Sequence, residues 1–313
     1  MRALVTGAGG FVGHYVVEAL RARGDDVFPY GGPHDEKEPA RVDARDEEAL
    51  LAMLHATRPD LIVHLAAQAF VPESIAAPLE TYEINALGTA RLAQAIRSYV
   101  DAGNPMPRLL FTSSAEVYGK RDGGDFPLRE TLATNPSNPY AASKAAAESI
   151  LLGEVHGLGL DAVIVRSFNH IGPGQSDRFV IPSFASQLAR IAAGGEQILW
   201  VGNLDARRDF LDVRDVVAAY LALAERGTSG EIYNVCSGVA RTIRDALREL
   251  IIAARVPVEV REDPERMRPS DVPLFVGDAS KLRAATGWEP SVPFKQSIRD
   301  IYAAAAGNTQ NRS

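Results

Sequence analysis

The sequence predicts an α/β fold: a doubly wound parallel sheet with a smaller C-terminal lobe. Three observations predict it: short β-branched or leucine-rich runs alternate with longer helical patterns, a glycine-rich turn follows the first run, and the alternation changes after Arg166. Strands and helices in alternation build a parallel sheet that is covered by helices on both faces. With 313 residues and 46% apolar content, the chain is long enough to bury the core of one two-lobed unit.

The individual elements follow from the local patterns. A helix is predicted over residues 11–23, where apolar side chains recur at helical spacing and Gly24 follows to end the helix. Residues 168–179 are rich in Gly, Pro and Asn, which predicts an irregular loop, and residues 263–273 contain three prolines, which predicts a lid or binding segment. The predicted strands are residues 2–6, 26–28, 61–64, 108–112, 162–166 and 231–234.

The composition excludes several classes of function. A formal net charge of −7 argues against an electrostatic grip on nucleic acid, which needs a basic face. The one cysteine, Cys236, leaves no pair for a disulfide framework and no metal-ligand spacing, so we expect no bound metal. The sequence shows no export signal and no run of about 18 apolar residues for a membrane span. We therefore expect a cytoplasmic protein that does not contact a membrane.

A glycine-rich turn between the first strand and the first helix is the strongest single signal. In residues 5–13, VTGAGGFVG, glycines stand at positions 7, 10 and 13. Gly7 allows a tight turn, Gly10 lets the backbone approach a pyrophosphate, and Gly13 lets the helix pack closely on the sheet. The helix N-terminus then offers amide groups and a positive dipole to phosphates. The turn predicts a dinucleotide site rather than a glycine-rich turn without a ligand.

Which dinucleotide binds stays open at this stage. The second strand ends in residues 28–32, FPYGG, without the carboxylate that would hold a ribose 2′-hydroxyl and without an obvious arginine for a 2′-phosphate. The cofactor is therefore NADP or NAD. Asp43 could face the adenine, or it could be a solvated carboxylate in a turn.

The division of the chain follows from these signals. Residues 1–168 are predicted to form the dinucleotide-binding lobe, which also receives about residues 209–240. Residues 169–208 and 241–305 are predicted to form the substrate-binding lobe. The polar residues 306–313 are predicted to be a frayed tail.

Tyr140 and Lys144 are the candidate catalytic pair. They stand four residues apart in an alanine-rich helical run, so both side chains project from one face. A fixed ammonium beside the phenol is expected to lower the pKa of the tyrosine and let it exchange a proton with a substrate oxygen. Ser114 lies at the end of a predicted strand, where doubly wound sheets place their chemistry, and its hydroxyl can bind the reacting oxygen.

The order of these motifs resembles the extended short-chain dehydrogenase/reductase superfamily. The glycine turn, Ser114, Tyr140 and Lys144 appear in that superfamily's order, and residues 64–68, HLAAQ, and 85–89, NALGT, are similar to its cofactor-side pattern. The resemblance implies a Rossmann-like, NAD(P)-dependent oxidoreductase that forms a homodimer through two helices per subunit. It also implies the cofactor-binding residues, which are Gly7, Gly10, Phe11, Val12, Gly13, Asp43, Ala44, Leu65, Ala66, Ala67, Tyr140 and Lys144.

Further motifs resemble the GDP-mannose branch of that superfamily and extend the resemblance over almost the whole chain. This branch includes GDP-4-keto-6-deoxymannose reductases, to which the chain is most similar, and GDP-mannose 4,6-dehydratases. The motifs are residues 166–175, RSFNHIGPGQ, 201–210, VGNLDARRDF, 268–272, RPSDV, and 286–290, TGWEP. The resemblance implies a GDP-linked sugar substrate, and arginine forks suit its diphosphate. The implied contacts are Asn169, Arg208 and Arg268 to the diphosphate and Asp271 to a ribose hydroxyl.

Glu116 leaves two reactions open. In a dehydratase, a carboxylate at this position would remove the C5 proton of the hexose. The dehydratases of this branch usually present threonine, then serine or aspartate, then glutamate, whereas this chain has Ser114, Ala115 and Glu116, and Ala115 cannot donate a proton. We therefore favour NAD(P)H-dependent reduction of a C4 ketone to a GDP-6-deoxyhexose of the GDP-rhamnose type. The alternatives are a GDP-mannose 4,6-dehydratase that uses Glu116 as base, a nucleotide-sugar epimerase, and a non-catalytic dinucleotide sensor.

Overall fold

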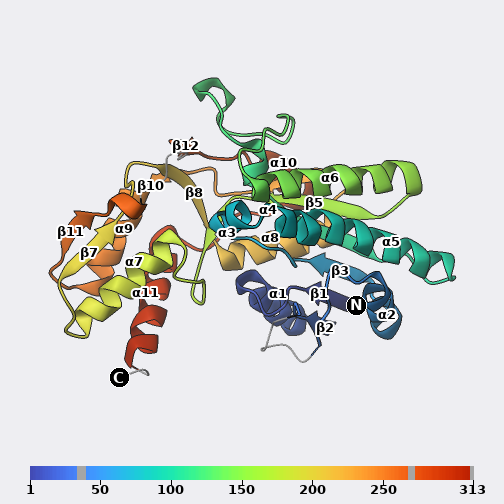
Figure 1. Cartoon of the computed structure of the whole chain (residues 1–313), viewed down its shortest axis with the longest axis horizontal. Helices are drawn as coiled ribbons and strands as arrows, with labels where there is room; N and C mark the ends of the chain where they lie inside the picture. The colour runs from blue at the N-terminus through green and yellow to red at the C-terminus, as the bar shows by residue number, and fades with distance from the viewer. Residues whose placement is uncertain (34–39, 267–271, 311–313) are drawn as a thin grey trace.

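The computed structural model describes residues 1–33, 40–266 and 272–310. A large lobe and a smaller lobe lie side by side (Figure 1), and the large lobe is built on a six-stranded sheet. Every neighbouring pair in this sheet is parallel, so the predicted doubly wound fold with a smaller C-terminal lobe is confirmed. The strand order is β2 (Asp26–Tyr30), β1 (Arg2–Thr6), β3 (Leu61–His64), β4 (Arg108–Ser114), β5 (Ala162–Ser167) and β9 (Ile232–Val235).

The strand order reverses at β1, and this reversal positions the site. From β1 the chain goes first to β2 on one side and then crosses to β3 on the other. In open α/β sheets, ligands bind at such a switch point, beyond the carboxyl ends of the strands. The glycine turn follows β1 directly, and Ser114 is the last residue of β4.

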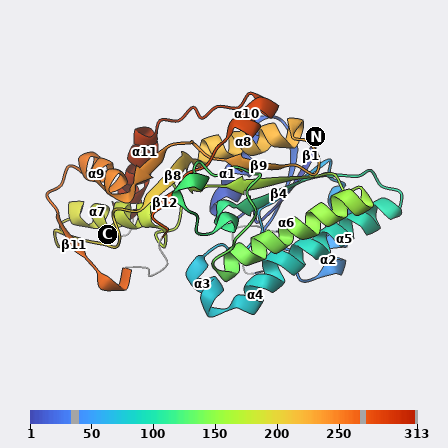
Figure 2. The same cartoon turned by 90° about the horizontal axis from the view of Figure 1, so that it is seen from above.

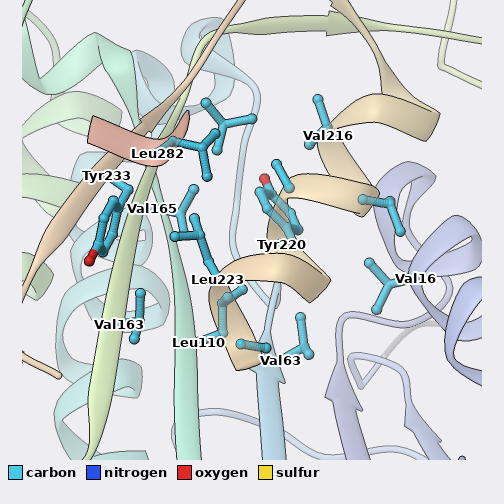
Figure 3. Packing of buried hydrophobic residues seen from close by; sticks show 14 of the residues in the cluster. Val16, Val63, Leu110, Val163, Val165, Val216, Tyr220, Leu223, Tyr233 and Leu282 are labelled. Atoms are coloured by element: carbon cyan, nitrogen blue, oxygen red, sulfur yellow. The ribbon is translucent and has the colours of Figure 1, made fainter. Parts of the chain in front are cut away.

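Helices cover both faces of the large sheet (Figures 1 and 2). On one face lie α2 (Glu47–Thr57), α5 (Gly88–Asp101) and α6 (Pro139–Leu158), and on the other lie α1 (Phe11–Ala22), α8 (Val213–Arg226) and α10 (Ser280–Thr286). Alternate residues of β4 enter the two cores: Leu109 and Phe111 face α5 and α6, and Leu110 faces α8. Figure 3 shows the α8 side, where Leu110 lies close to Leu223 and Tyr220 belongs to the same cluster.

Short helical segments connect the strands near the site. β3 leads through α3 (Val71–Ala76), α4 (Pro78–Tyr82) and a π-helix, η1 (Glu83–Leu87), into α5. β4 leads through two 3₁₀ turns, η2 (Ala115–Tyr118) and η3 (Gly123–Asp125), into α6. The π-helix places the buried Asn85 against the start of α6, because the amide of Asn85 donates to the hydroxyl of Ser143 at 2.9 Å.

The smaller lobe has a core of its own. Buried side chains from α7 (Val180–Ala192), α9 (Ile243–Ala254) and α11 (Phe294–Gln310) pack together. A mixed sheet in the order β10–β8–β12, with β6 also paired to β8, and a two-stranded sheet of β7 and β11 surround them. The bounds are β6 Asn169–Ile171, β7 Ile198–Val201, β8 Arg207–Asp212, β10 Ala240–Thr242, β11 Glu259–Glu262, β12 Leu274–Phe275 and the 3₁₀ turn η4 Pro264–Arg266.

The structure differs from the sequence-based expectations in three places. The segment 168–179 is not wholly irregular, because β6 forms a parallel pair with β8. α10 lies within the range assigned to the substrate lobe, yet its Leu282 packs in the core under the large sheet. The tail is not frayed from residue 306, because α11 continues to Gln310. No helix within the described part of the chain is long and apolar enough to cross a membrane.

Candidate active site

The glycine turn has the shape of a phosphate cradle. Gly7 has a φ of +71°, and a Cβ there would lie 2.7 Å from the backbone nitrogen of Ala66. A Cβ on Gly13 would lie 2.3 Å from the carbonyl oxygen of Gly7, so helix α1 can approach the turn this closely only with glycine. At Gly10 a Cβ would meet only the Gly7 oxygen, at 3.2 Å, and no side chain caps the helix there. The turn therefore leaves the helix start open to an anion, and its residues fit a dinucleotide pyrophosphate.

The segment after β3 lies directly against this turn. The Leu65 amide donates to the Thr6 carbonyl at 3.1 Å, and the Ala66 amide donates to the Thr6 hydroxyl at 3.4 Å. Leu65, Ala66 and Ala67 come directly after β3, beside the switch point of the sheet. The predicted cofactor residues 65–67 thus lie across from Gly7.

Asp43 and Ala44 lie beyond the end of β2. The Gly31 amide donates to the Ala40 carbonyl at 2.9 Å, and the Val42 amide donates to the Gly31 carbonyl at 3.1 Å. This pairing brings the segment that precedes Asp43 alongside the last strand residues. The Asp43 carboxylate binds Arg45, with Nη2 and Oδ2 at 2.7 Å, so a neighbouring arginine is one of its partners.

The catalytic candidates Ser114, Tyr140 and Lys144 converge at the end of β4. The side chain of Ser114 lies close enough to the phenol of Tyr140, on α6, to act on its pKa. The Nζ of Lys144 donates to the Thr112 carbonyl at 2.7 Å and lies 4.9 Å from the centre of the Phe111 ring. Lys144 is buried and Tyr140 is half-buried. Ser114 and Tyr140 thus lie close together, and Lys144 lies nearby against the same strand.

The expected lowering of the Tyr140 pKa is wrong for this structure. Burial raises the pKa of Tyr140 to about 12, a raise that the hydrogen bond from Ser114 opposes and the nearby carboxylate of Glu116 reinforces. The ammonium of Lys144 is directed to the Thr112 carbonyl, which is why it does not act on the phenol as expected. Burial also lowers the pKa of Lys144 to about 8. At neutral pH the site therefore holds a protonated phenol beside a lysine ammonium.

Several side chains fix the start of α6. The Asn138 Oδ1 accepts from the Ala141 amide at 2.8 Å and so caps the helix, and Pro139 occupies the first turn. The Tyr140 amide donates to the Ser74 hydroxyl of α3 at 3.2 Å. The sequence analysis did not identify Ser74 or Asn138 as site residues. Asn138 was detectable from the Asn-Pro pair that marks a helix start, whereas Ser74 carries no local signal.

Glu116 lies at the edge of the catalytic group. It is half-buried in η2, its amide donates to the Ser114 hydroxyl at 3.2 Å, and its Oε2 lies 3.4 Å from the Asn138 amide nitrogen. Its carboxylate acts on the pKa of Tyr140. The structure thus places Glu116 close to the phenol of Tyr140, and no bond joins the two.

The substrate-binding candidates are only partly described. Asn169 is exposed on β6 and pairs with Phe210, two residues beyond Arg208 on the neighbouring strand β8. The Nη1 of Arg208 donates to the Val272 carbonyl at 2.6 Å. Arg268 and Asp271 lie outside the described residues. Asn169 and Arg208 are therefore brought to adjacent strands of the smaller lobe.

Two contacts join the smaller lobe to the cofactor side. The ring of Phe11, at the start of α1, stacks on His170 with centroids 6.0 Å apart, and Val12 packs at the edge of the core under α1. Phe70, just before α3, meets Phe179 edge-on at 5.9 Å. The segment from β6 to the start of α7 therefore runs from the glycine turn to α3. Across residues 1–33, 40–266 and 272–310, no group of three His, Cys, Asp or Glu side chains could hold a metal ion.

Comparison with known proteins finds a matching family model, similar sequences and similar solved structures. The family model described as GDP-mannose 4,6 dehydratase matches residues 4–301. The chain is 41% identical over 301 residues to GDP-6-deoxy-D-mannose reductase of Pseudomonas aeruginosa, covering 96% of this chain and 95% of the relative. It is 31% identical over 288 residues to GDP-6-deoxy-D-talose 4-dehydrogenase of Aggregatibacter actinomycetemcomitans, covering 92% of each. The solved structure of RMD from Pseudomonas aeruginosa complexed with NADPH superposes with a TM-score of 0.88 at 39% identity, covering 98% of this chain and all (100%) of that one.

Proposed function

This chain belongs to the GDP-mannose 4,6-dehydratase family of NAD(P)-dependent nucleotide-sugar enzymes, and from that premise we propose that it reduces the C4 ketone of a GDP-4-keto-6-deoxyhexose. One observation carries the proposal. The phenol of Tyr140 lies next to Ser114 at the end of β4, with the buried Lys144 on the same helix and the glycine turn at the nearby switch point. The product would be a GDP-6-deoxyhexose of the GDP-rhamnose type.

Each group of the trio has a task in this reduction. Bound NAD(P)H would supply hydride to C4. Tyr140 gives its phenolic proton to the oxygen that becomes an alkoxide, and its raised pKa keeps that proton in place at neutral pH. Ser114 donates to the same oxygen and holds it in line with the phenol, and Lys144 holds the ribose next to the nicotinamide. The cofactor contacts are proposed for the glycine turn, for Asp43 and Ala44, and for residues 65–67.

The residues around Glu116 favour reduction over dehydration. Ala115 offers no side-chain proton donor between Ser114 and Glu116. The Glu116 carboxylate lies by the Asn138 amide and also raises the pKa of Tyr140, which favours a proton-donating phenol. The relative at 41% identity is a reductase. Dehydration of GDP-mannose with Glu116 as base is the second candidate, because a carboxylate does stand near the reacting phenol.

We also propose how the substrate and the subunits are held. Asn169, Arg208, Arg268 and Asp271 would hold the GDP moiety. Residues 169–208 and 241–305, except α10, would form the substrate-binding part, and residues 1–168 with about 209–240 the dinucleotide-binding part. A homodimer is supported by three exposed apolar side chains next to α6, which are Ile75, Leu79 and Leu87 at 62%, 77% and 43% exposure. We place the enzyme in the cytoplasm, where NAD(P)H is supplied.

The test is a direct assay of the purified protein. GDP-4-keto-6-deoxymannose is added with NADPH or with NADH, and the loss of nicotinamide absorbance is followed together with the sugar product. We expect oxidation of at least one cofactor and one molecule of GDP-6-deoxyhexose for each molecule oxidised. Conversion of GDP-mannose to the keto sugar, without net oxidation of either cofactor by the keto sugar, would show a dehydratase. Interconversion of C4 epimers without net cofactor use would show an epimerase.

A further inference from the structure

Helix α6 buries a second charged residue beyond the catalytic trio. Glu148 stands one helical turn after Lys144, and both Glu148 and its partner Arg166 on β5 are only 3% exposed. Arg166 donates to both carboxylate oxygens, with Nη2 and Oε2 at 2.7 Å and Nε and Oε1 at 3.0 Å. The Ser113 hydroxyl donates to Oε1 at 2.5 Å. Ser113 on β4 and Arg166 on β5 are paired neighbours in the sheet, so the Glu148 carboxylate binds two residues that lie side by side.

Three contacts link α6 with the last residues of β4. Glu148 binds Ser113, Lys144 binds the carbonyl of Thr112, and Tyr140 lies next to Ser114. Three successive strand residues are thus joined to three successive turns of one helix. A buried ion pair is weak evidence for stability, because apolar residues of similar volume often serve as well. The location of this pair, one turn from the catalytic lysine, indicates another use.

We propose that Glu148, held by Arg166 and Ser113, is a positioning residue that fixes α6 against β4 and keeps the amine of Lys144 protonated. The inference rests on the proposed function, because that function places Lys144 at the ribose of the cofactor. Nothing in the catalytic trio itself supplies a negative charge to Lys144. Glu148 does so from one turn away, while its own bonds are satisfied by Arg166 and Ser113.

The charge on Lys144 decides how many hydrogen bonds the residue can give. An ammonium has three N–H donors, and one of them goes to the Thr112 carbonyl. Two donors then remain for a pair of ribose hydroxyls, whereas a neutral amine would have one. Burial lowers the pKa of Lys144 to about 8, and the Glu148 carboxylate acts against that lowering. Near neutral pH, the second ribose contact therefore depends on Glu148.

The other groups that face Lys144 do not supply this charge. From β3, His64 is buried, and burial together with Lys144 lowers the pKa of His64 to about 3, so it is neutral when the enzyme works. From β4 come the ring of Phe111 and the carbonyl of Thr112, which are uncharged. On α6, the phenol of Tyr140 stays protonated because its pKa is raised to about 12. The Glu116 carboxylate acts on Tyr140.

The experiment compares two substitutions of opposite charge in the full-length protein. Glu148→Gln removes the negative charge of the buried pair, and Arg166→Gln removes its positive charge. The dissociation constant of NADPH, from nicotinamide fluorescence, and kcat/KM for the keto sugar are both measured from about pH 6 to 10, the range around the lysine titration. We expect both quantities to worsen above a midpoint near the lysine pKa. Glu148→Gln should move this midpoint down by about one pH unit, and Arg166→Gln should not move it down.

The outcomes separate a positioning role from a purely structural one. If the pair served only to hold the fold, both variants would lose stability while the midpoint stayed at the wild-type pH, and the proposal would be overturned. If Glu148→Gln does not fold, because it leaves the Arg166 charge buried without its partner, the double variant E148Q/R166Q restores neutrality and should still show the lower midpoint. The NADPH measurement needs no turnover, so it tests Glu148 even if the keto sugar proves not to be the substrate. A wild-type dissociation constant without any pH dependence in this range would also overturn the proposal.

Discussion

Asn138 contacts Glu116 with one end of its amide and caps helix α6 with the other. Its nitrogen lies 3.4 Å from the Glu116 Oε2, and its oxygen accepts from the Ala141 amide at 2.8 Å. The residue that caps α6 therefore also contacts the carboxylate that, under the proposed function, bears on the choice between reduction and dehydration. Because the two tasks use opposite ends of one amide, substitutions can separate them.

We expect Asn138→Asp to keep the helix cap and lose the contact with Glu116. Aspartate caps helices about as well as asparagine, so the free energy of unfolding should stay within about 0.5 kcal/mol of wild type. A second carboxylate beside Glu116 should lower kcat/KM by about tenfold, the size of one lost hydrogen bond to a charged group. Urea unfolding and steady-state kinetics measure the two effects. Asn138→Ala is the control, because it should also lower the free energy of unfolding by about 1 kcal/mol.

Two glycines of the cofactor turn should fail in different ways. Gly10→Ala adds a Cβ that meets only the Gly7 oxygen, at 3.2 Å, so the protein should still fold. The new methyl group would stand where the phosphate approaches, so the variant should bind NADPH at least about tenfold more weakly. Gly13→Ala places its Cβ 2.3 Å from the Gly7 oxygen and should lower the free energy of unfolding by about 1–3 kcal/mol.

The control for both glycine variants is Gly153→Ala on α6. No atom lies within 4 Å of a Cβ at this exposed helical position. It should therefore bind NADPH as wild type and be slightly more stable, by about 0.5–1 kcal/mol. NADPH fluorescence titration and urea unfolding distinguish the three variants. A Gly10→Ala protein that binds NADPH with unchanged affinity would contradict the assignment of the cradle.

The parts of this site that local spacing encodes could be predicted from the sequence. The glycines at 7, 10 and 13 lie at one strand-to-helix junction, and this position alone predicts what each of them does. Tyr140 and Lys144 share a helix face because they are one helical turn apart. The alternation of apolar runs likewise predicts the parallel sheet, since strands buried on both faces must be apolar throughout.

The parts that depend on distant partners could not be predicted. β6 is three residues long and exists because β8, some forty residues later, pairs with it. The pKa of Tyr140 is raised because the fold buries the phenol, while the Thr112 carbonyl binds the ammonium of Lys144. The contact between Asn138 and Glu116 joins two segments 22 residues apart whose turn geometry has no simple sequence pattern.

Tyr140→Phe should remove turnover and leave cofactor binding intact. The phenol is the proton donor of the proposed reduction, and a positioned acid contributes about 10²–10⁴-fold to the rate, so kcat should fall by that factor. The NADPH dissociation constant should stay within about twofold, because Lys144 still faces Thr112. Tyr118→Phe is the matched control: it removes a buried phenol that donates to Asn234 at 2.7 Å, so it should lower stability while kcat stays near wild type. Equal losses of kcat in the two variants would argue against Tyr140 as the acid.

Arg208→Gln should weaken the nucleotide sugar alone. If the guanidinium holds the diphosphate, KM for the keto sugar should rise by about tenfold or more, as for a lost charge-assisted hydrogen bond, with NADPH binding unchanged. The neighbouring Arg207 is exposed on the same strand and points to the other side of it, so Arg207→Gln is the control and should leave KM near wild type. Initial-rate kinetics with each substrate varied in turn checks both. A rise in KM for both variants would indicate a general effect of net charge.

His64 should control how the protein loses stability in acid. Burial lowers the pKa of His64 from 6.5 to about 3, and its Nδ1 lies 2.7 Å from the Thr6 hydroxyl. Above pH 6.5 the residue is neutral in both the folded and the unfolded chain. Between pH 6.5 and about 3 the unfolded chain binds a proton at His64 that the folded chain does not bind. As the pH is lowered through this range, the free energy of unfolding should therefore decrease by up to about 1.4 kcal/mol per pH unit. In His64→Asn this part of the slope should vanish even if the variant is less stable at pH 7. The control is His14→Asn, at an exposed position on α1, which should keep the wild-type slope. The free energy of unfolding is measured with urea from pH 7 to about 4. An unchanged slope in His64→Asn would mean that another group takes up the proton.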